Sequence, residues 1–255
     1  MELLKTTKLS KAFGGLKAVS DFEVYLNKGE LAGLIGPNGA GKTTVFNLLT
    51  GVYEPTEGEI LFDGKNVAGL KPYQVTQRGM ARTFQNIRLF SDLTVIDNVK
   101  IAYHQHASYG VASAFLRLPG YYKGEKEMAD KSLELLKIFK LEDKKDEIAK
   151  NLPYGEQRRL EIARALAAQP KLLLLDEPAA GMNPQETQEL MEMIAWIRKE
   201  FDLTILLIEH DMSLVMGVCE RIYVLDYGMI IAAGTPAEIK SNPKVIEAYL
   251  GEEVH

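Results

Sequence analysis

Cysteine is nearly absent from this chain of 255 residues, which carries Cys219 alone and therefore has no internal disulfide bond. That usage suits a reducing compartment. Long apolar runs are lacking too: Leu172–Leu175 and Ile205–Ile208 are far shorter than the roughly 20 residues that cross a bilayer. The opening "MELLKTTKLSKAF" has no continuous apolar segment and is not a secretory signal. We therefore expect a cytoplasmic protein that reaches a membrane only through a partner or a surface.

A basic arm is also missing. The net charge is −5, so nucleic acid is not an expected partner. Hydrophobic residues make up 46% of the chain and charged residues 25%, which is typical of a soluble globular protein. The length allows one large core or two modest ones.

Short apolar runs alternate with helical patterns, which predicts an α/β fold. We expect strands over "ELAGLIGP", "MARTFQ" (ending at Gln85), "KLLLLDEP" and "LTILLIEH" (ending at His210). Two further strands are expected around the Tyr227–Gly228 turn, and "EGEILFDGKNV" predicts a strand and turn near a sheet edge. Helices are expected over "KTTVFNLLTG" and "PQETQELMEMIAWIRKEF", and two short helices finish the chain.

The segment from Leu93 to Leu141 has helical spacing at both ends. Between them, "HASYGVASAFLRLPGYYKG" is rich in glycine and aromatic residues and reads as a loop. We therefore expect a single domain, 1–255, with an α/β core formed by 1–90 and 170–255. A helical subdomain, 91–169, is inserted in that core.

One motif indicates nucleotide binding. "GPNGAGKTT" matches the phosphate-loop pattern G-x-x-x-x-G-K-[ST], with a buried strand before it and a helix after it. Its backbone amides are expected to surround phosphates, while Lys42 reaches the β and γ oxygens and Thr43 binds Mg²⁺. The predicted phosphate-binding residues are Gly36, Pro37, Asn38, Gly39, Ala40, Gly41, Lys42, Thr43 and Thr44.

Polar residues at the ends of other predicted strands complete this site. Asp176 is positioned to hold magnesium, and Glu177 to deprotonate an attacking water. The carboxyl ends of parallel strands face the ligand, so His210 is a candidate γ-phosphate donor. Gln85 is a candidate for contact with the magnesium ion or its water.

Together these residues, in this order, resemble the ATPase subunit of ATP-binding-cassette (ABC) transporters. The resemblance spans nearly the whole chain and implies a P-loop NTPase core with a mixed sheet, an antiparallel β subdomain and an inserted helical subdomain. It implies that Phe13 stacks on adenine, Gln85 is the Q-loop glutamine and His210 the switch histidine. The cofactors implied are ATP and Mg²⁺.

The stretch "LPYGE" stands where the family has the signature LSGGQ. In that family this helix start closes over the triphosphate held by the other subunit of a head-to-tail dimer, which implies nucleotide contact for Tyr154, Gly155 and Glu156. Pro153 replaces the usual serine, and Asn183 replaces the usual aspartate of the D-loop, "AAGMN". We expect weaker binding across the interface, with the mechanism retained.

Several variant motifs, among them "ARTFQNIRLF" and "DEPAAGMNP", look like the ATPases of branched-chain amino-acid importers. That resemblance implies a second ABC ATPase, identical or different, integral membrane permeases, and indirectly a solute-binding protein. It places the chain peripherally on the inner face of the cell membrane. The apolar residues Ile87, Leu89, Phe90 and Leu93 form a candidate permease-docking segment.

Other classes fit less well. A small-molecule kinase needs neither Glu177 nor a signature helix, and a GTPase usually carries N-K-x-D, whereas Asn27–Lys28 precedes the loop and continues differently. A cassette that acts on DNA or ribosomes commonly has tandem cassettes, coiled coils or basic insertions. An inactive interaction module would not need Lys42, Asp176, Glu177 and His210 intact. An importer of another polar solute remains an alternative.

Overall fold

A computed structural model of the chain describes residues 1–107 and 109–250. The chain forms two compact units, one made of Met1–Arg82 with the residues from Lys171 onward, and the other of Thr83–Pro170. The second unit begins at Thr83, earlier than the predicted boundary at Ser91, because the chain leaves the sheet after β7 (Met80–Arg82). Its last residue, Pro170, lies one residue beyond the predicted end.

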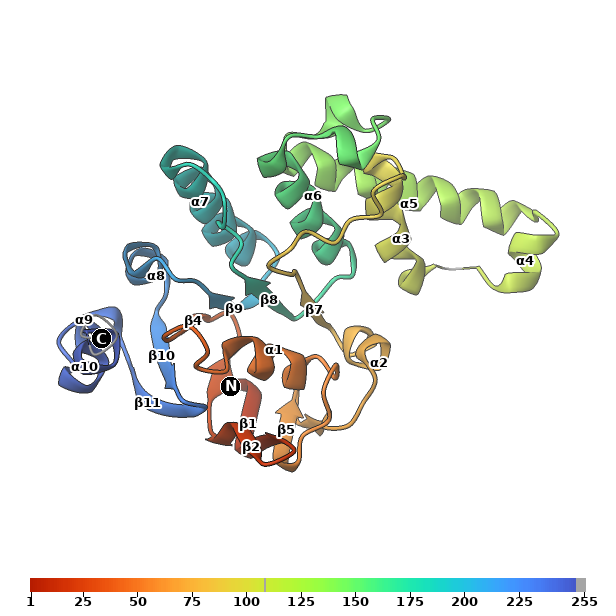
Figure 1. Cartoon of the computed structure of the whole chain (residues 1–255). Helices are drawn as coiled ribbons and strands as arrows, with labels where there is room; N and C mark the ends of the chain where they lie inside the picture. Colours follow the sequence, from red (N-terminus) through yellow and green to blue (C-terminus); the bar gives the residue numbers. More distant parts are fainter. Residues whose placement is uncertain (108, 251–255) are drawn as a thin grey trace. The chain divides into compact units, whose positions relative to one another are not determined.

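The first unit contains a six-stranded sheet in the order β11-β10-β4-β9-β8-β7 (Figure 1). β11 runs antiparallel to β10 and all other neighbours are parallel, so the sheet is mixed as predicted. Every residue of β4, β8 and β9 is buried, which explains why these strands are apolar throughout. The bounds are β4 (Leu31–Ile35), β8 (Leu172–Asp176), β9 (Thr204–Ile208), β10 (Arg221–Asp226) and β11 (Met229–Gly234).

The second sheet of this unit is antiparallel, with the order β2-β1-β5-β6 and β3 paired to β1. The turn between β5 and β6 places Asp63 and Gly64 at φ values of 48° and 74°, the backbone of a tight hairpin turn. The predicted strand and turn in this region are therefore confirmed. The bounds are β1 (Glu2–Phe13), β2 (Leu16–Phe22), β3 (Tyr25–Asn27), β5 (Glu57–Phe62) and β6 (Lys65–Asn66).

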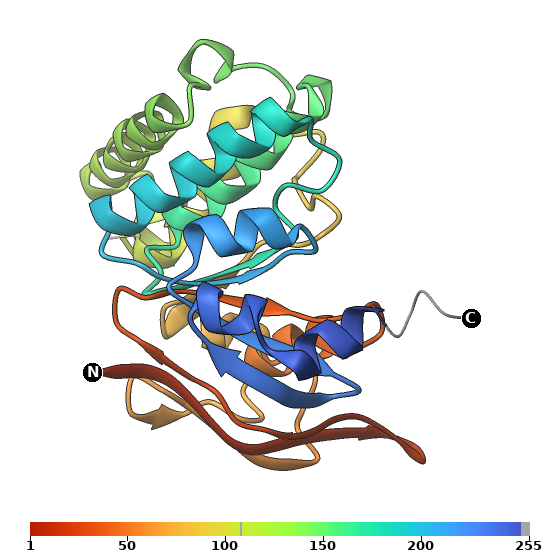
Figure 2. The ribbon, with the colours of Figure 1, turned by 90° about the vertical axis from the view of Figure 1, so that its left-hand side faces the viewer.

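Both sheets of the first unit share one apolar core, in which Phe22 and Phe62 of the antiparallel sheet join Leu174 and Leu206 of the mixed sheet and Phe46 of α1. The predicted helices over α1 and α7 and at the end of the chain are present, and α9 and α10 pack beside β11 (Figure 2). The short helix α8 was not predicted. The bounds are α1 (Lys42–Leu49), α2 (Pro72–Gln77), α7 (Pro184–Glu200), α8 (Met212–Val218), α9 (Pro236–Lys240) and α10 (Pro243–Leu250).

The second unit is helical. Its described residues form α3 (Val95–Tyr103), α4 (Val111–Phe115), α5 (Pro119–Ile138) and α6 (Tyr154–Ala167), and three short 3₁₀ turns. Thr94 caps α3 by accepting the Asp97 amide at 3.2 Å. The predicted loop between the helical patterns instead contains α4 and the start of α5, which Pro119 opens at a position that needs no amide donor. Within residues 1–107 and 109–250, no helix combines the length and apolarity needed to span a membrane.

Two predicted strand ends were wrong. β7 ends at Arg82, before Gln85, and β9 ends at Ile208, before His210. β9 stops because its neighbour turns away: Asp176 pairs with Ile208, and the next residue, Glu177, adopts a φ of 47°. The polar residues at these ends therefore sit in loops just beyond the strands.

Candidate nucleotide-binding site

The phosphate loop joins the buried strand β4 to α1, and two of its glycines are sterically required. A Cβ atom at Gly36 would lie 1.9 Å from the Leu225 carbonyl oxygen, and one at Gly41 would lie 2.7 Å from that of Ala18. Gly41 also has a φ of 105°, a backbone conformation that glycine adopts readily and that residues with a Cβ atom disfavour. The neighbouring strands thus hold this loop so closely that only glycine fits at both positions.

Lys42 opens α1 and is folded over the loop. Its side chain is buried, and Nζ donates hydrogen bonds to the carbonyl oxygens of Gly36 at 2.6 Å and Pro37 at 2.9 Å. Within the described part of the chain no side chain caps α1, and the first turn of this helix carries no acidic residue. A helix start with its dipole and a lysine, and without a competing carboxylate, is suited to bind an anion.

The hairpins around the loop fix it in place. The Gly228 amide, in the turn between β10 and β11, donates to the Ala40 carbonyl at 2.8 Å, and the Ser20 amide on β2 donates to the Gly228 carbonyl at 2.8 Å. Phe13 lies at the tip of the β1–β2 hairpin, 44% exposed, with Tyr53 edge-on at 5.2 Å between ring centroids. Phe13 is therefore an accessible aromatic ring, not a core residue.

Asp176, the last residue of β8, is buried and pairs with Arg82 of β7, whose Nη2 lies 2.6 Å from its Oδ2. Arg82 also donates to Asn47 Oδ1 on α1 at 2.7 Å, which ties the two strands to the helix that carries the phosphate loop. Neither Arg82 nor Asn47 was predicted from the sequence as a site residue. The only sequence signal was an arginine ending a short buried strand, which a search for ligand residues passes over.

Glu177 and His210 meet directly. The Nε2 atom of His210 lies 2.5 Å from Oε1 of Glu177, although the residues come from loops after two different strands. The Glu177 side chain is 10% exposed and that of His210 is 45% exposed, so the pair faces solvent from the histidine side. The left-handed backbone of Glu177 costs about 1–2 kcal/mol, and such strain is typical of functional sites.

The predicted signature residues lie in the second unit, at the start of α6. The helix begins at Tyr154, so Gly155 belongs to its first turn and Pro153 is the capping residue. The Pro153 carbonyl accepts hydrogen bonds from the Glu156 and Gln157 amides at 3.0 and 2.9 Å. For the amides of Tyr154 and Gly155, the described part of the chain provides no acceptor. Two donors at a helix start are thus available for an external anion.

The other side chains of this helix start are already engaged. Lys144 donates to both carboxylate oxygens of Glu156 at 2.8 and 2.6 Å, which offsets the negative charge that would repel a phosphate. The Tyr154 hydroxyl accepts from Arg158 at 3.2 Å, one turn further along the helix. Gly155 and the backbone therefore remain the main groups through which this motif would contact a nucleotide.

Gln85, the predicted Q-loop glutamine, is also in the second unit, where α6 holds its backbone. The fully buried Arg158 donates to the carbonyls of Phe84 and Gln85, each at 2.6 Å, and to Glu161 at 2.8 Å. Glu161 in turn accepts the Arg88 amide at 3.0 Å. Hydrogen bonds thus join α6 to the segment after β7. This role of Arg158 was not predicted from the sequence.

Asn183 of the predicted D-loop is the capping residue of α7. Its Oδ1 accepts the Glu186 amide at 2.9 Å, and Glu186 accepts the Asn183 amide at 3.1 Å, which is a complete capping box. The residue therefore has a structural task besides any contact across a subunit interface.

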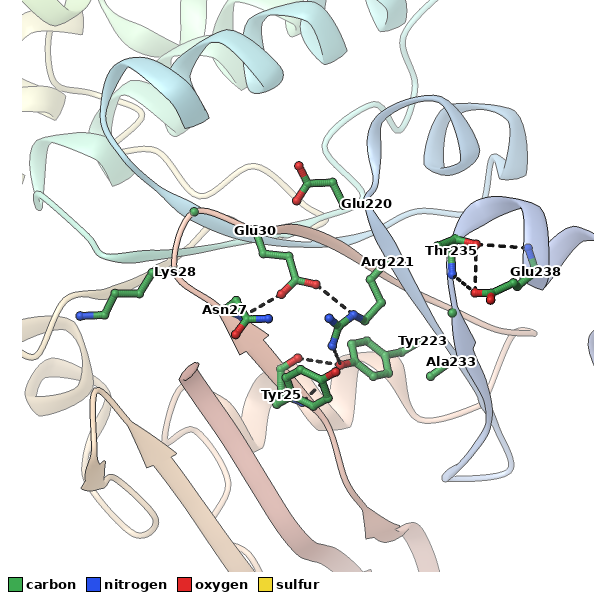
Figure 3. Close-up of a pocket in the computed structure, with 12 residues that line it drawn as sticks. Tyr25, Asn27, Lys28, Glu30, Glu220, Arg221, Tyr223, Ala233, Thr235 and Glu238 are labelled. Atoms are coloured by element: carbon green, nitrogen blue, oxygen red, sulfur yellow. Dashed lines mark hydrogen bonds and ion pairs between the residues drawn. The ribbon is translucent and has the colours of Figure 1, made fainter. Parts of the chain in front are cut away.

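A separate open pocket of about 540 Å³ lies by the residues that precede β4 and start β10 (Figure 3). Its central groups satisfy one another: Glu30 accepts from Arg221 at 3.1 Å and from the Asn27 amide at 2.7 Å, and Arg221 stacks over the Tyr25 ring at 4.1 Å (Figure 3). Glu30 directly precedes β4 and Arg221 is the first residue of β10, so both lie at the amino-terminal ends of these parallel strands, whereas Asp176 and Glu177 lie at the carboxyl end of β8. None of the predicted site residues lines this pocket.

The first unit offers the ligands that a magnesium nucleotide requires. The phosphate loop supplies backbone amides and Lys42, and Mg²⁺ prefers oxygen ligands such as the Thr43 hydroxyl and the Asp176 carboxylate. A phosphate loop between a buried parallel strand and a helix, with an acidic pair at the carboxyl end of a second strand of that sheet, defines a P-loop nucleoside triphosphatase.

Comparison with known proteins places the chain within this class. Residues 19–180 match the ABC transporter family, and residues 229–255 match the branched-chain amino acid ATP-binding cassette transporter family. The chain belongs to the ABC transporter family and is an ATPase of that family. The resemblance inferred from the sequence, and the fold class with it, are confirmed.

Individual relatives cover almost the whole chain. LivG of Escherichia coli, a high-affinity branched-chain amino acid transport ATP-binding protein, is 50% identical over 98% of each chain. BraF of Pseudomonas aeruginosa, another high-affinity branched-chain amino acid transport ATP-binding protein, is 44% identical over 98% of each chain. A solved ATP-binding cassette of an ABC transporter, in its ADP conformation, gives a TM-score of 0.85 at 33% identity and covers 98% of this chain and 99% of that one.

Proposed function

We propose that this chain is the ATP-hydrolysing subunit of an importer of branched-chain amino acids. The observation that carries the proposal is its 50% identity with LivG over 98% of both chains. The match of residues 229–255 to a branched-chain amino acid cassette family supports the cargo. Family membership alone would not identify the cargo, because an ATP-binding protein of a lipopolysaccharide export system, LptB of Haemophilus influenzae, is also 36% identical over 99% of both chains.

Uptake of labelled leucine tests the cargo. In cells that lack their own ATPase subunit for this import, we expect the wild-type chain to restore uptake of leucine, isoleucine and valine, with Lys42→Ala as the inactive control. Restored uptake of a different polar solute, with none for the three amino acids, would contradict the proposed cargo and favour another importer.

The geometry of the first unit supports a proposed nucleotide site. Lys42 and the amides of the phosphate loop bind the β- and γ-phosphates, and Phe13 stacks on the base. Thr43 and Asp176 would hold Mg²⁺, and Gln85 is proposed as a further ligand. When bound, magnesium neutralises charge on the phosphates. Arg82, at 2.6 Å from Asp176, keeps that carboxylate in place.

Hydrolysis requires a base and an oriented γ-phosphate. Glu177 orients and deprotonates the attacking water, while His210, 2.5 Å from Glu177, holds the carboxylate in position and contacts the γ-phosphate. We expect Glu177→Gln to retain ATP binding and to lose about 100-fold or more in kcat, the range of general-base catalysis. Near-normal hydrolysis by this variant would remove Glu177 from the role.

Two cassettes are proposed to close head to tail over two ATP molecules. The start of α6, with its two available amides and Gly155 in the first turn, binds the γ-phosphate held by the partner cassette. Solution mass tests this step: Glu177→Gln should dimerise with ATP and Mg²⁺, and Gly155→Asp in that background should abolish the dimer by adding a carboxylate. A monomer in both cases would favour a different cassette as the natural partner, which a mixture with that subunit would reveal.

The permease is proposed to dock on the segment from Ile87 to Leu93. Asn98, fully buried, fixes this segment by donating to the Phe90 carbonyl at 3.1 Å and accepting its amide at 2.9 Å. Phe90 and Leu93 remain 47% and 37% exposed. Arg158 and Glu161 hydrogen-bond the backbone of residues 84, 85 and 88 to α6. A movement of the docking segment would therefore be transmitted to the proposed signature helix through these bonds. Docking of this kind would hold the ATPase peripherally on the inner face of the membrane.

A further inference from the structure

Glu209 is a buried acid that the mechanism above leaves unused. It follows β9, is 5% exposed, and lies directly before His210. Acidic residues are rarely so buried unless they are paired. Among the described residues no lysine or arginine forms an ion pair with it. Its carboxylate instead accepts two backbone amides, from Ala179 at 2.9 Å and from His210 at 3.3 Å.

These two amides belong to the two loops that carry the proposed hydrolytic pair. Ala179 follows Glu177 by two residues, and His210 is the other member of the pair. We propose that Glu209 is a positioning residue for ATP hydrolysis, whose carboxylate joins the loop after β8 to the loop after β9 so that Glu177 and His210 stay in contact. This inference rests on the roles of Glu177 and His210 given under the proposed function.

The sheet explains why such a link is needed here. The ladder between β8 and β9 continues through the Glu177 amide, which donates to the Ile208 carbonyl at 2.9 Å. Beyond that bond the left-handed backbone of Glu177 turns its chain away, and the paired register of the two described strands ends there. Beyond this point the Glu209 side chain accepts a hydrogen bond from the Ala179 amide and so links the two segments where the strand pairing has ended.

The loop after β8 is then fixed at both ends. Glu209 holds it at Ala179, and the capping box of Asn183 holds it where α7 begins. Between them, the Ala180 amide donates to the Glu177 carbonyl and the Met182 amide to the Ala179 carbonyl, each at 3.1 Å. Loss of the Glu209 link would free the end of the loop that lies nearest to Glu177.

Paired substitutions at Glu209 test the proposal. Glu209→Met fills the space but accepts neither amide, whereas Glu209→Gln keeps one oxygen for the Ala179 amide. We expect the Met variant to lower kcat about tenfold or more, because small displacements of reacting groups are costly, while the dissociation constant for ATP changes less than about twofold. The Gln variant should keep kcat within about threefold of the wild type, since one acceptor oxygen is enough for that bond.

Glu30 provides the matched control, since it is also a buried glutamate with its own hydrogen-bond partners (Figure 3). It precedes β4, whereas Glu177 and His210 follow β8 and β9. Glu30→Met should lower thermal stability and leave kcat of the folded protein unchanged. Equal kcat losses in both Met variants, unaltered kcat in Glu209→Met, or equal losses in Glu209→Met and Glu209→Gln would each overturn the proposal. Glu177→Gln, measured in parallel, shows separately whether the hydrolytic role of Glu177 holds.

If Glu209→Met does not fold, hydrogen exchange decides the question in Glu209→Gln and the wild type. The Ala179 amide should be protected in both proteins, at a level well above that of an exposed loop amide. Exchange of this amide at the rate of an unstructured loop in the wild type would overturn the proposed link.

Discussion

Arg158 offers the sharpest test of how the second unit is held together. Its guanidinium is fully buried and donates to the Phe84 and Gln85 carbonyls and to Glu161. We predict that Arg158→Met lowers the free energy of unfolding by about 3–5 kcal/mol, the cost of removing one partner of a buried ion pair. Glu161, which is 1% exposed, would keep its bond from the Arg88 amide but lose the cation that balances its charge.

A neighbouring arginine on the same helix supplies the control. The side chain of Arg159 is 26% exposed, and its ion pair with Glu156 spans 4.0 Å. Arg159→Met should therefore cost less than about 1 kcal/mol. A double variant, Arg158→Met with Glu161→Leu, should recover much of the loss, because it removes both charges together.

Urea unfolding followed by circular dichroism gives the free energies, and hydrogen exchange of α6 amides reports on residues 83–170 directly. A loss of less than about 1 kcal/mol in Arg158→Met, or equal losses for Arg158→Met and Arg159→Met, would refute the reasoning. It would mean that the contacts of Arg158 add nothing beyond those of a surface residue.

Three further predictions follow from single sites. Burial raises the pKa of the Cys219 thiol to about 12, so a thiol reagent at a mildly alkaline pH should label it only in denaturant; rapid labelling of the native protein would contradict this burial. Gly36→Ala would place a Cβ atom 1.9 Å from the Leu225 carbonyl oxygen, so titration with a fluorescent ATP analogue should show lost affinity, while wild-type affinity would refute the steric argument. Burial also raises the pKa of Glu209 above its ordinary value, so the folded state binds the Glu209 proton more tightly than the unfolded state does. Protonation of Glu209 therefore stabilises the folded state at low pH, and this stabilisation is lost as the pH rises through the pKa of the folded state. Glu209→Gln should remove that fall in unfolding free energy, and an identical pH dependence in both proteins would contradict it.

Local sequence patterns were enough to predict much of the fold. The phosphate loop was predictable because its glycines, lysine and threonine lie close together in the sequence. The central strands were predictable because a strand that is apolar on both faces, such as β8, is typical of the interior of a parallel sheet. The meeting of Glu177 and His210 was also within reach, since parallel strands bring their carboxyl ends to one edge.

Residues that act through distant backbone groups were not predictable. The contact of Arg158 with Gln85 and that of Glu209 with Ala179 join segments 73 and 30 positions apart, and in each pair the acceptor or donor is a backbone group without a side-chain signal. The strand ends were missed because they depend on where a neighbouring strand turns away. In the same way, α4 was hidden by glycine and aromatic residues that suggested a loop.

The capping role of Asn183 has a consequence for how the proposed pair of cassettes could diversify. Asparagine and aspartate cap helices about equally well, so an exchange between them leaves the start of α7 intact. The position can therefore gain or lose a negative charge with almost no effect on folding. A natural exchange between asparagine and aspartate at position 183 would then change the electrostatic attraction between the proposed paired subunits without changing the stability of either subunit. Such a change needs only one substitution.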